Sequence, residues 1–273
     1  MTFHTAISEA KPGRVTVRGF AHDDLIGDVS FAAGAFLTLT GRLPSAAELE
    51  LVNAMLNSVI DHGFVSVTTA TARYAASGNP QLLSAVAAGL LAIGDNTLSP
   101  QASYLLLQRV AALAAEAGVT DAEAAGRVVH DILVADGRIP GLGHPIHESV
   151  DYRAEGVFRV ASRVGIEGRY SALLRDVHRT FLEQTGKRQV PINIDGCLAS
   201  VSLDLGLSLH QAVGLAVIGV MPGLIAHVAE EIADGVPLRY IEDGNYTGES
   251  ARPLPESAER VPAAPPDTLT AGT

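Results

Sequence analysis

Three copies of one short pattern constrain the fold of this chain more than any other feature of its sequence. In each copy a serine or threonine is followed three residues later by glutamate or glutamine, at residues 45–48, 120–123 and 208–211. This is a capping box, in which the hydroxyl accepts a hydrogen bond from a helix amide and the later side chain reaches back. After each copy apolar residues recur at helical spacing, as Leu49, Val52, Leu56 and Ile60 do after the first. The pattern predicts a mostly α-helical fold.

Few segments of the sequence favour strands. Only residues 14–19, RVTVRG, alternate clearly enough to predict a strand, and aromatic residues make up just 5% of the chain. Turns rich in glycine and proline divide the chain at residues 94–96, 137–145, 186–191 and 235–237. The apolar stretch at 212–228 contains Pro222 and lies between polar residues, so we expect a buried helix rather than a membrane span.

Charge and cysteine content limit the partners and the compartment. Thirty acidic residues outweigh 19 lysines and arginines, and the formal net charge of −11 argues against attraction to nucleic acid or anionic membranes. The single cysteine, Cys197, excludes an internal disulfide and a multi-cysteine metal site. The first residues lack the basic start and apolar run of a signal peptide, so we expect a cytoplasmic protein. From about Thr247 the composition turns to Pro, Ala, Glu and Thr, which predicts a disordered tail over residues 249–273.

Residues 139–153, IPGLGHPIHESVDYR, form neither a regular helix nor a strand, because prolines and glycines interrupt both. Gly141 and Gly143 allow unusual backbone geometry and let a ligand approach the main chain. His144, held in this loop, suits proton transfer at cellular pH, although a purely structural histidine fits the loop equally well. His144 and His147 also have the spacing of two metal ligands on a helical turn. The sequence offers them no obvious third ligand and no His-Glu-x-x-His pattern.

Two more ionisable residues are candidates for chemistry. Arg153 has a guanidinium suited to a substrate carboxylate, or to a solvated salt bridge with Asp151 or Glu155. Asp195 lies in apolar surroundings that raise the pKa of a carboxyl and make it a better base. The same aspartate could instead cap a helix that begins near Cys197.

Three other residues have weaker local signals. His62 follows an amphipathic helix and precedes a threonine-rich segment, so it suits either a helix cap or an anion site. Cys197 is interpreted as a buried small residue rather than a nucleophile. His227, in an apolar helix, is interpreted as a packing or interface residue.

Taken together, the motifs resemble the citrate synthase superfamily, and especially its citryl-CoA lyase branch. The likeness runs from about Thr5 to Gly248. Its motifs are TAIS at 5–8, DDLIG at 23–27, LTGRLPS at 39–45, DHG and TTATAR within 61–73, GLGH and DYR within 141–153, NIDG at 193–196, PGLIAHVAEE at 222–231 and YTG at 246–248. The resemblance implies a mostly all-α, citrate synthase-like fold. In it, residues 1–98 and 207–248 would form a large helical domain and residues 99–206 a small one, with the active-site cleft between them.

The resemblance also implies roles for single residues. His144 matches the GxGH histidine, which interacts with the oxygen on the carbon that is attacked or released. Asp195 matches the aspartate that moves the proton at the acetyl-CoA methyl carbon. Arg153 and His62 match groups that bind the oxo-acid. Arg239 matches a late arginine that, in the synthases, reaches across a dimer interface.

Coenzyme A is expected along the loop that carries the GxGH motif. The backbone of this loop can recognise adenine, and nearby cations can meet the phosphates. The residues concerned are Gly141, Leu142 and Gly143 in the loop, with Arg138, Lys187 and Arg188 as the cations. The resemblance further implies a homodimer that binds an acyl-CoA and a small oxo-acid or hydroxy-acid, with no metal or redox cofactor.

This sequence departs from the family pattern in three places. Tyr152 replaces the proline of the family's D-P-R signature. The histidine that hydrogen-bonds the thioester oxygen of the enol is missing from residues 94–101, GDNTLSPQ, where Asn96, Thr97 or Ser99 is expected to substitute. Losing one such donor costs enzymes about 10²–10³ in rate. An arginine expected before the P-G-x-I-A-H segment is also absent, since Val220 and Met221 stand there, so we expect an acyl group with fewer carboxylates than citrate.

The resemblance implies a carbon–carbon lyase that cleaves a 3-hydroxyacyl-CoA such as citryl-CoA to acetyl-CoA and an oxo-acid such as oxaloacetate. His144 would assist deprotonation of the hydroxyl, and Asp195 would protonate the acetyl-CoA enolate. Because the two groups named above are missing, three alternatives remain. They are Claisen condensation, acyl-CoA hydrolysis and a non-catalytic acyl-CoA-binding paralogue.

Overall fold

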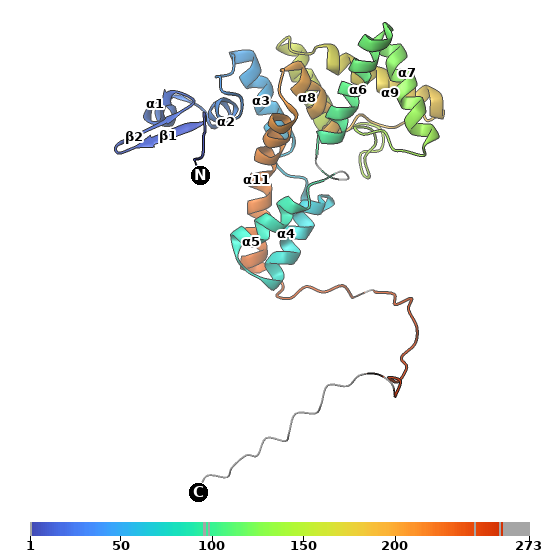
Figure 1. Ribbon diagram of the computed structural model, residues 1–273. Helices are drawn as coiled ribbons and strands as arrows, with labels where there is room; N and C mark the ends of the chain where they lie inside the picture. Colours follow the sequence, from blue (N-terminus) through green and yellow to red (C-terminus); the bar gives the residue numbers. More distant parts are fainter. Residues whose placement is uncertain (1, 95–96, 98, 243, 257, 259–273) are drawn as a thin grey trace. The chain divides into compact units, whose positions relative to one another are not determined.

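The computed structural model describes every residue except 1, 95–96, 98, 243, 257 and 259–273. Its described residues form eleven α-helices, one short 3-10 helix and one three-stranded sheet (Figure 1). The prediction of a mostly helical fold is therefore confirmed. The chain divides into two units, residues 1–239 and 240–273, and the described residues of the second unit form no helix or strand. The division of the first unit into a large and a small domain stays a prediction, as does the tail at 249–273.

The sheet lies at the N-terminal end of the first unit and is antiparallel, in the order β1-β2-β3. Its strands are β1 (Ser8–Lys11), β2 (Arg14–Val17) and β3 (Phe20–Ala21), so the predicted strand is confirmed as β2. Strand β2 ends before Arg18 and Gly19, the next two residues, whose φ angles are positive at 50° and 88°. The Arg18 guanidinium then donates to the Thr38 carbonyl from Nε (3.0 Å) and Nη2 (2.8 Å). Because Thr38 lies in α2 (Phe31–Thr40), which follows α1 (His22–Asp28), these bonds attach the sheet to a helix.

All three capping boxes are present in the structure. They start α3 (Ala46–Ser58), α7 (Asp121–Val134) and α11 (Leu209–Asp234), with the hydrogen bonds made in both directions. The helical spacing that followed the first box extended to Ile60, whereas α3 ends at Ser58. The helix starts were thus readable from the sequence, and this helix end was not.

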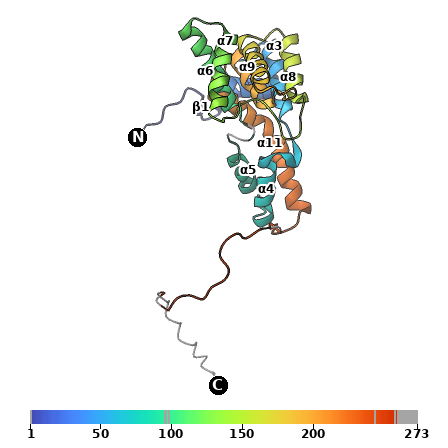
Figure 2. The ribbon, with the colours of Figure 1, turned by 90° about the vertical axis from the view of Figure 1, so that its right-hand side faces the viewer.

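Helices α4 (Val67–Gly78) and α5 (Leu82–Leu91) pack against each other and against α11. The three lie side by side in both ribbon views (Figures 1 and 2). They share a small apolar cluster made of Ala72, Ala76, Ala85, Val86, Leu224 and Val228. This cluster fixes the middle and the last turn of α4 against the C-terminal half of α11.

The larger core surrounds α10 (Ile194–Asp204), which contacts four helices. They are α6 (Gln101–Ala117), α8 (Tyr152–Arg163), α9 (Arg169–Thr185) and α11. Nearly every residue of α10 is buried, and Asp195 and Asp204 are the two of partial burial. A helix so enclosed is a rigid support for a functional side chain.

Helix α11 is 26 residues long, and of the described helices it is the one with the length and apolar composition of a membrane span. It contacts α2, α3, α4, α5, α6 and α10. This packing buries part of its apolar surface, including Leu215, Val220 and Val228, whereas Ile225 and Ile232 stay exposed.

Candidate functional site

His62 is held by a close contact between α11 and the segment that follows α3. The N–H of Gly223 donates to the Ile60 carbonyl (3.0 Å), and a Cβ at position 223 would collide with that oxygen. Pro222 has no N–H to give, so the helix backbone is already interrupted at this turn. His62 precedes η1 (Gly63–Val65) and makes no capping hydrogen bond there. Of its two predicted roles, a helix cap is therefore wrong.

The loop that carries His144 is tied to the start of α10. Gly141 has a φ of +86°, and a Cβ there would lie 2.8 Å from the Gly196 Cα. The N–H of Asn193 donates to the Gly141 carbonyl, and its side-chain amide donates to the Gly143 carbonyl, both at 2.9 Å. Two glycines in backbone contact thus place the His144 loop against the turn that bears Asp195.

Asn193 is also the cap of α10. Its Oδ1 accepts a hydrogen bond from the Gly196 N–H at 3.0 Å, and the helix begins at Ile194. The alternative that Asp195 caps a helix beginning near Cys197 is therefore wrong. Asp195 lies inside the first turn with its side chain free for another purpose.

His144 has a fixed pattern of hydrogen bonds. Its Nδ1 accepts the backbone N–H groups of Ile146 (3.1 Å) and His147 (3.0 Å). Burial lowers the pKa of His144 to about 4, and the nearby charge of Arg153 contributes to this. His144 is therefore neutral at cellular pH, with its proton on Nε2. It is a hydrogen-bond donor toward whatever lies beyond Nε2.

Three imidazoles meet at this point. The ring centroids of His144 and His147 are 4.4 Å apart and stacked, and His62 lies 5.3 Å from the first and 5.4 Å from the second. Tyr152, which replaces the family's proline, packs edge-on against His147 at 5.2 Å. The Nε2 atoms of His62 and His147 are buried and have no hydrogen-bond partner among the described residues. Burial also lowers the pKa of His62.

These histidines form the one group with metal-ligand spacing in the described part of the chain. Their ligand nitrogens all lie within 4.8 Å of one another, and His62 is the third ligand that the sequence did not reveal. The Nδ1 lone pair of His144, however, is already taken by two backbone amides, and Nε2 carries the proton. The positive charge of the Arg153 guanidinium also contributes to lowering the pKa values of His62 and His144. Both features favour a substrate oxygen over a cation.

Arg153 and Asp151 form a buried ion pair. Nε and Nη2 of Arg153 donate to the two carboxylate oxygens of Asp151 at 2.9 and 2.8 Å, and the residues are only 6% and 1% exposed. The predicted pairing with Asp151 is confirmed, but it is buried rather than solvated. Burial alone would raise the pKa of Asp151, but hydrogen bonds from Arg153 and from the Ile194 N–H hold it below its usual range. Asp151 occupies the edge of the guanidinium formed by Nε and Nη2, so Nη1 remains free to donate to a substrate.

Asp195 is a carboxyl with an unusual environment. Its Oδ1 is enclosed and has no hydrogen-bond partner among the described residues. Burial raises the pKa of Asp195 to about 6, and the charge of Asp151 adds to this, while Arg153 and a hydrogen bond from the Ser99 backbone oppose it. Such a group changes protonation state close to cellular pH, as a general acid or base requires.

The turn before α6 is the segment from which the family's histidine is missing. The backbone of Ser99 in this turn reaches Asp195. Thr97 pairs its backbone with Gly94 in both directions, at 3.0 and 3.2 Å. Asn96 lies outside the described residues. Of the substitutes predicted for the missing histidine, Ser99 is thus beside the carboxyl, and a substrate contact from Thr97 stays a prediction.

A small cavity of about 20 Å³ lies beside His62, with space for a single water, and His144, His147 and Asp195 are not among the residues that line it. Both residues predicted to bind the oxo-acid, His62 and Arg153, line it. The other lining residues are Val59, Asp61, Ser66, Thr68, Thr69, Val220 and Leu224. Asp61 is paired with His227, whose Nε2 lies 3.0 Å from Oδ1, so His227 packs where we expected and also makes a polar contact.

Arg239 is not brought to this cavity within one chain. Its Nε donates to Oε1 of Glu231 at 2.6 Å, and its backbone N–H donates to Ser77 Oγ at 3.1 Å. Glu231 is buried and also accepts from Arg73. Arg239 therefore links the C-terminal end of α4, through Ser77, to that of α11, through Glu231. Its role across a dimer interface stays a prediction.

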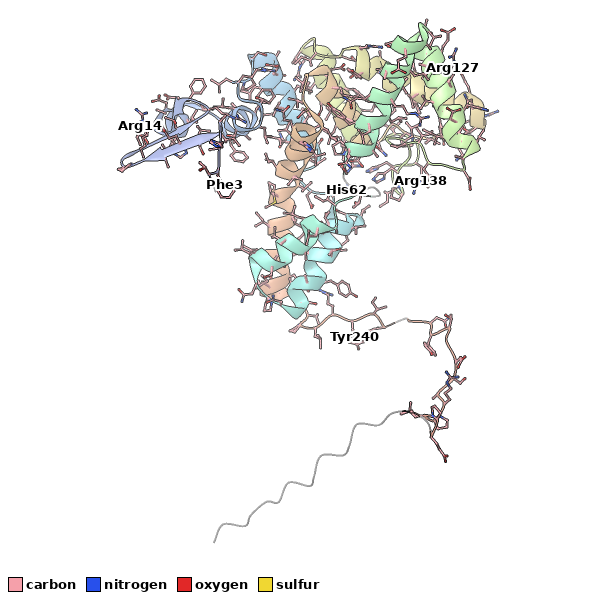
Figure 3. The ribbon with its side chains drawn as sticks, viewed as in Figure 1. Phe3, Arg14, His62, Arg127, Arg138 and Tyr240 are labelled. Carbon is pink, nitrogen blue, oxygen red and sulfur yellow. The ribbon has the colours of Figure 1, made fainter. Side chains whose placement is uncertain are left out.

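The three cations predicted to meet coenzyme A lie on two loops that are joined. Leu142 pairs with Ile192 in an isolated β-bridge, and the N–H of Gly143 donates to the Pro191 carbonyl at 2.8 Å. The side chains concerned, Arg138 (labelled in Figure 3), Lys187 and Arg188, are exposed. The sequence-distant loops thus present positive charge beside the GxGH backbone.

Cys197 is enclosed in the core. Its thiol is fully buried and donates to the Ala154 carbonyl at 3.5 Å. Burial raises the pKa of the Cys197 thiol far above its ordinary value. The interpretation as a buried small residue is confirmed.

Comparisons with known proteins agree with this arrangement. The chain matches the family described as "Citrate synthase, C-terminal domain" over residues 48–241. It is 31% identical to the citryl-CoA lyase from Hydrogenobacter thermophilus, with a TM-score of 0.82 over 93% of this chain and 98% of that one. No curated protein sequence matches the chain significantly.

Two more distant structures share the fold. The ATP citrate lyase from Methanothrix soehngenii, solved with citrate and coenzyme A, is 23% identical with a TM-score of 0.76. The match covers 92% of this chain but 42% of that one, so this chain corresponds to less than half of that enzyme. The citrate synthase from Thermotoga maritima is 14% identical with a TM-score of 0.57, over 93% of this chain and 96% of that one. Fold, motifs and family match agree, and the chain belongs to the citrate synthase family.

Proposed function

We propose that this protein is a carbon–carbon lyase that cleaves a 3-hydroxyacyl-CoA, such as citryl-CoA, to acetyl-CoA and an oxo-acid such as oxaloacetate. The similarity to a citryl-CoA lyase along 98% of that enzyme's chain supports cleavage over hydrolysis. The scheme uses the coenzyme A thioester as substrate and needs no metal or redox cofactor.

One observation carries the proposal. A carboxyl with a pKa of about 6, Asp195, and a neutral imidazole that donates from Nε2, His144, lie on two turns joined by the Gly141–Gly196 contact. A structural loop histidine would not need its tautomer fixed on a turn that contacts the one bearing such a carboxyl. An acid and a hydrogen-bond donor are two of the groups that carbon–carbon cleavage next to a thioester requires.

The bond changes follow from these protonation states. The substrate hydroxyl loses its proton, its oxygen becomes the carbonyl of the oxo-acid, and the carbon–carbon bond breaks. The bonding electrons form the enolate of acetyl-CoA, and protonated Asp195 delivers a proton to its methylene carbon. His144 donates a hydrogen bond to the developing carbonyl oxygen.

The proton of the substrate hydroxyl needs an acceptor other than His144. The Nδ1 lone pair of His144 already accepts two backbone amides. His147 has a buried Nε2 with no partner among the described residues, and with His62 assigned to the carboxylate the His147 imidazole takes the hydroxyl proton. His144 therefore assists deprotonation as expected, but not as the proton acceptor. It stabilises the substrate oxygen that loses its proton.

The remaining roles follow from position. Nη1 of Arg153 and His62 hold a carboxylate in the cavity, and the turn at residues 97–99 stabilises the thioester oxygen of the enolate. The backbone of Gly141, Leu142 and Gly143 receives the adenine of coenzyme A, while Arg138, Lys187 and Arg188 meet its phosphates. We further propose a cytoplasmic homodimer, in which Arg239 reaches the partner's cleft.

The test is incubation of the purified chain with citryl-CoA, with thioesters and free acids followed by mass spectrometry. We expect acetyl-CoA and oxaloacetate in equal amounts, and no product from Asp195→Asn. Asp131→Asn, an exposed position on α7, is the matched control and should behave as the unmodified chain. Release of free coenzyme A with citrate would instead identify a hydrolase, and binding without product would identify a non-catalytic paralogue.

A further inference from the structure

Two residues of α11 hold the segment that leads to His62. Gly223 and His227 are four residues apart and therefore lie on one face of the helix. The N–H of Gly223 donates to the Ile60 carbonyl, and Nε2 of His227 donates to Oδ1 of Asp61, both at 3.0 Å. A Cβ at position 223 would lie only 2.9 Å from that same Oδ1. The Asp61 side chain is therefore held directly on the surface of α11.

The imidazole of His227 is fixed by other contacts as well. Its ring centroid lies 5.8 Å from that of Phe64, with the two rings tilted by 56°. The guanidinium of Arg73 lies over the Phe64 ring, 4.9 Å from its centroid. Nε of Arg73 in turn donates to Oε2 of Glu231, one turn beyond His227 on α11, at 2.6 Å. The donor that faces Asp61 is thus oriented by a chain of packed side chains.

Asp61 shares its cavity with the groups proposed to bind the substrate. His62 and Arg153 line the same cavity. Nε2 of His62 has no hydrogen-bond partner among the described residues, and Nη1 of Arg153 lies outside the two bonds to Asp151. A carboxylate is the ligand that both donors suit, and Asp61 carries one.

The Asp61 carboxylate is a potential internal competitor for these donors. A group tethered next to His62 has an effective concentration on the order of millimolar. Among the described residues, His227 is the one side chain that hydrogen-bonds Asp61. The bond to His227 therefore decides where this carboxylate lies.

We propose that His227 is a positioning residue for the lyase reaction, because it holds the Asp61 carboxylate on α11 and out of the substrate's carboxylate site. The inference rests on the proposed lyase function and assigns a new residue to it. His227 acts through Asp61 and does not touch the substrate. Keeping a competing group away from a binding site is a form of negative design.

The test measures kcat and KM for citryl-CoA in variants of His227. His227→Ala releases the Asp61 carboxylate, and we expect KM to rise about fivefold with kcat unchanged, because a fraction of the molecules then has an occupied site. His227→Gln keeps an N–H donor and should recover most of the affinity. His210→Ala, an exposed histidine near the start of the same helix, is the control and should leave both constants unchanged.

A double variant separates this role from a purely structural one. With Asp61→Asn added to His227→Ala, an amide replaces the competing carboxylate, so KM should return to that of the unmodified chain. If His227 served packing alone, KM would stay raised in the double variant, and this result would overturn the inference. An unchanged KM in His227→Ala would also overturn it and leave the lyase function standing.

Two further measurements complete the test. Denaturant unfolding shows whether His227→Ala is folded. If it is not, His227→Phe, which keeps a ring beside Phe64 and lacks the donor, takes its place with the same expected results. An unmodified chain that does not cleave citryl-CoA would overturn the lyase function and the inference with it.

Discussion

In water a histidine has a higher pKa than an aspartate, but in this site the pKa of Asp195 is the higher of the two. The pKa of Asp195 is raised to about 6 and that of His144 is lowered to about 4. Burial causes both shifts, because an enclosed site penalises the charged form of each group. At cellular pH His144 is therefore neutral, and Asp195 keeps a protonated fraction that can act as an acid.

The pH dependence of cleavage follows from the raised pKa of Asp195. Cleavage needs the protonated carboxyl, so kcat/KM should be constant below pH 6 and fall about tenfold per unit above it. The reverse condensation needs the carboxylate, so its kcat/KM should rise through the same pH and then level off. Initial rates measured in both directions from pH 5 to 8 check this. A cleavage rate that increases with pH across this range would show that Asp195 is not the acid.

The donor role of His144 is open to a matched substitution. His144→Ala removes the Nε2–H, and we expect kcat to fall by about 10²–10³, the usual effect of losing one donor to a developing oxygen charge. His144→Gln keeps an N–H donor and should recover part of the rate. His130→Ala, an exposed histidine on α7, is the control. An unchanged kcat in His144→Ala would contradict the proposed contact.

At the scale of elements, the site depends on how closely a loop approaches a helix. Gly141 and Gly143 both have positive φ angles, of +86° and +82°, so alanine is strained at either position. A Cβ at 141 would lie 2.8 Å from the Gly196 Cα, whereas a Cβ at 143 would lie 3.8 Å from its nearest neighbour, Val190. The two positions therefore share the strain but differ in the contact.

This difference gives a paired prediction. Both alanine variants should be destabilised by about 1 kcal/mol through backbone strain, and Gly141→Ala by about 1–3 kcal/mol more through overpacking. Because the collision also separates the His144 loop from α10, kcat should fall more in Gly141→Ala than in Gly143→Ala. Denaturant unfolding and initial rates measure both effects. Equal stability and equal rates in the two variants would show that the loop does not need this contact.

Local sequence patterns predicted where helices begin better than they predicted which helices and loops pack together. The capping boxes located the starts of α3, α7 and α11, and Gly141 and His144 were recognised as parts of a functional loop. The pairing of Asp151 with Arg153, two residues later, was predicted as a solvated salt bridge, but its burial was not. A pairing within one short motif is visible in the sequence, but its burial is not, because burial depends on α8 and α10 packing together.

The third histidine illustrates the same limit. The sequence showed His144 and His147 close together, but His62 joins them from a segment more than eighty residues earlier. No periodicity records such a contact, since it depends on α11 holding the end of α3 in place. The sequence showed that Val220 stands where an arginine was expected. Only the folded chain shows that its side chain lines the cavity.

For the whole molecule, local charge has to overcome a net charge of −11 before a polyanion such as coenzyme A can bind. We propose that Arg138, Lys187 and Arg188, on two joined loops, supply this charge. We expect replacement of any one by alanine to raise the Kd for coenzyme A about fivefold, equivalent to about 1 kcal/mol, and affinity to fall as salt rises. Arg127, exposed on α7 and labelled in Figure 3, is the control. Calorimetric titration measures each value, and a similar loss in Arg127→Ala would indicate a general charge effect.

The size of the cavity beside His62 has a kinetic meaning. At about 20 Å³ it has space for about one water, so a hydroxy-acid fits only after the lining side chains move apart. Where this movement precedes binding, loading begins with a first-order opening of the protein. Adding more substrate speeds association only until this opening becomes limiting, and above that concentration the observed rate stays constant.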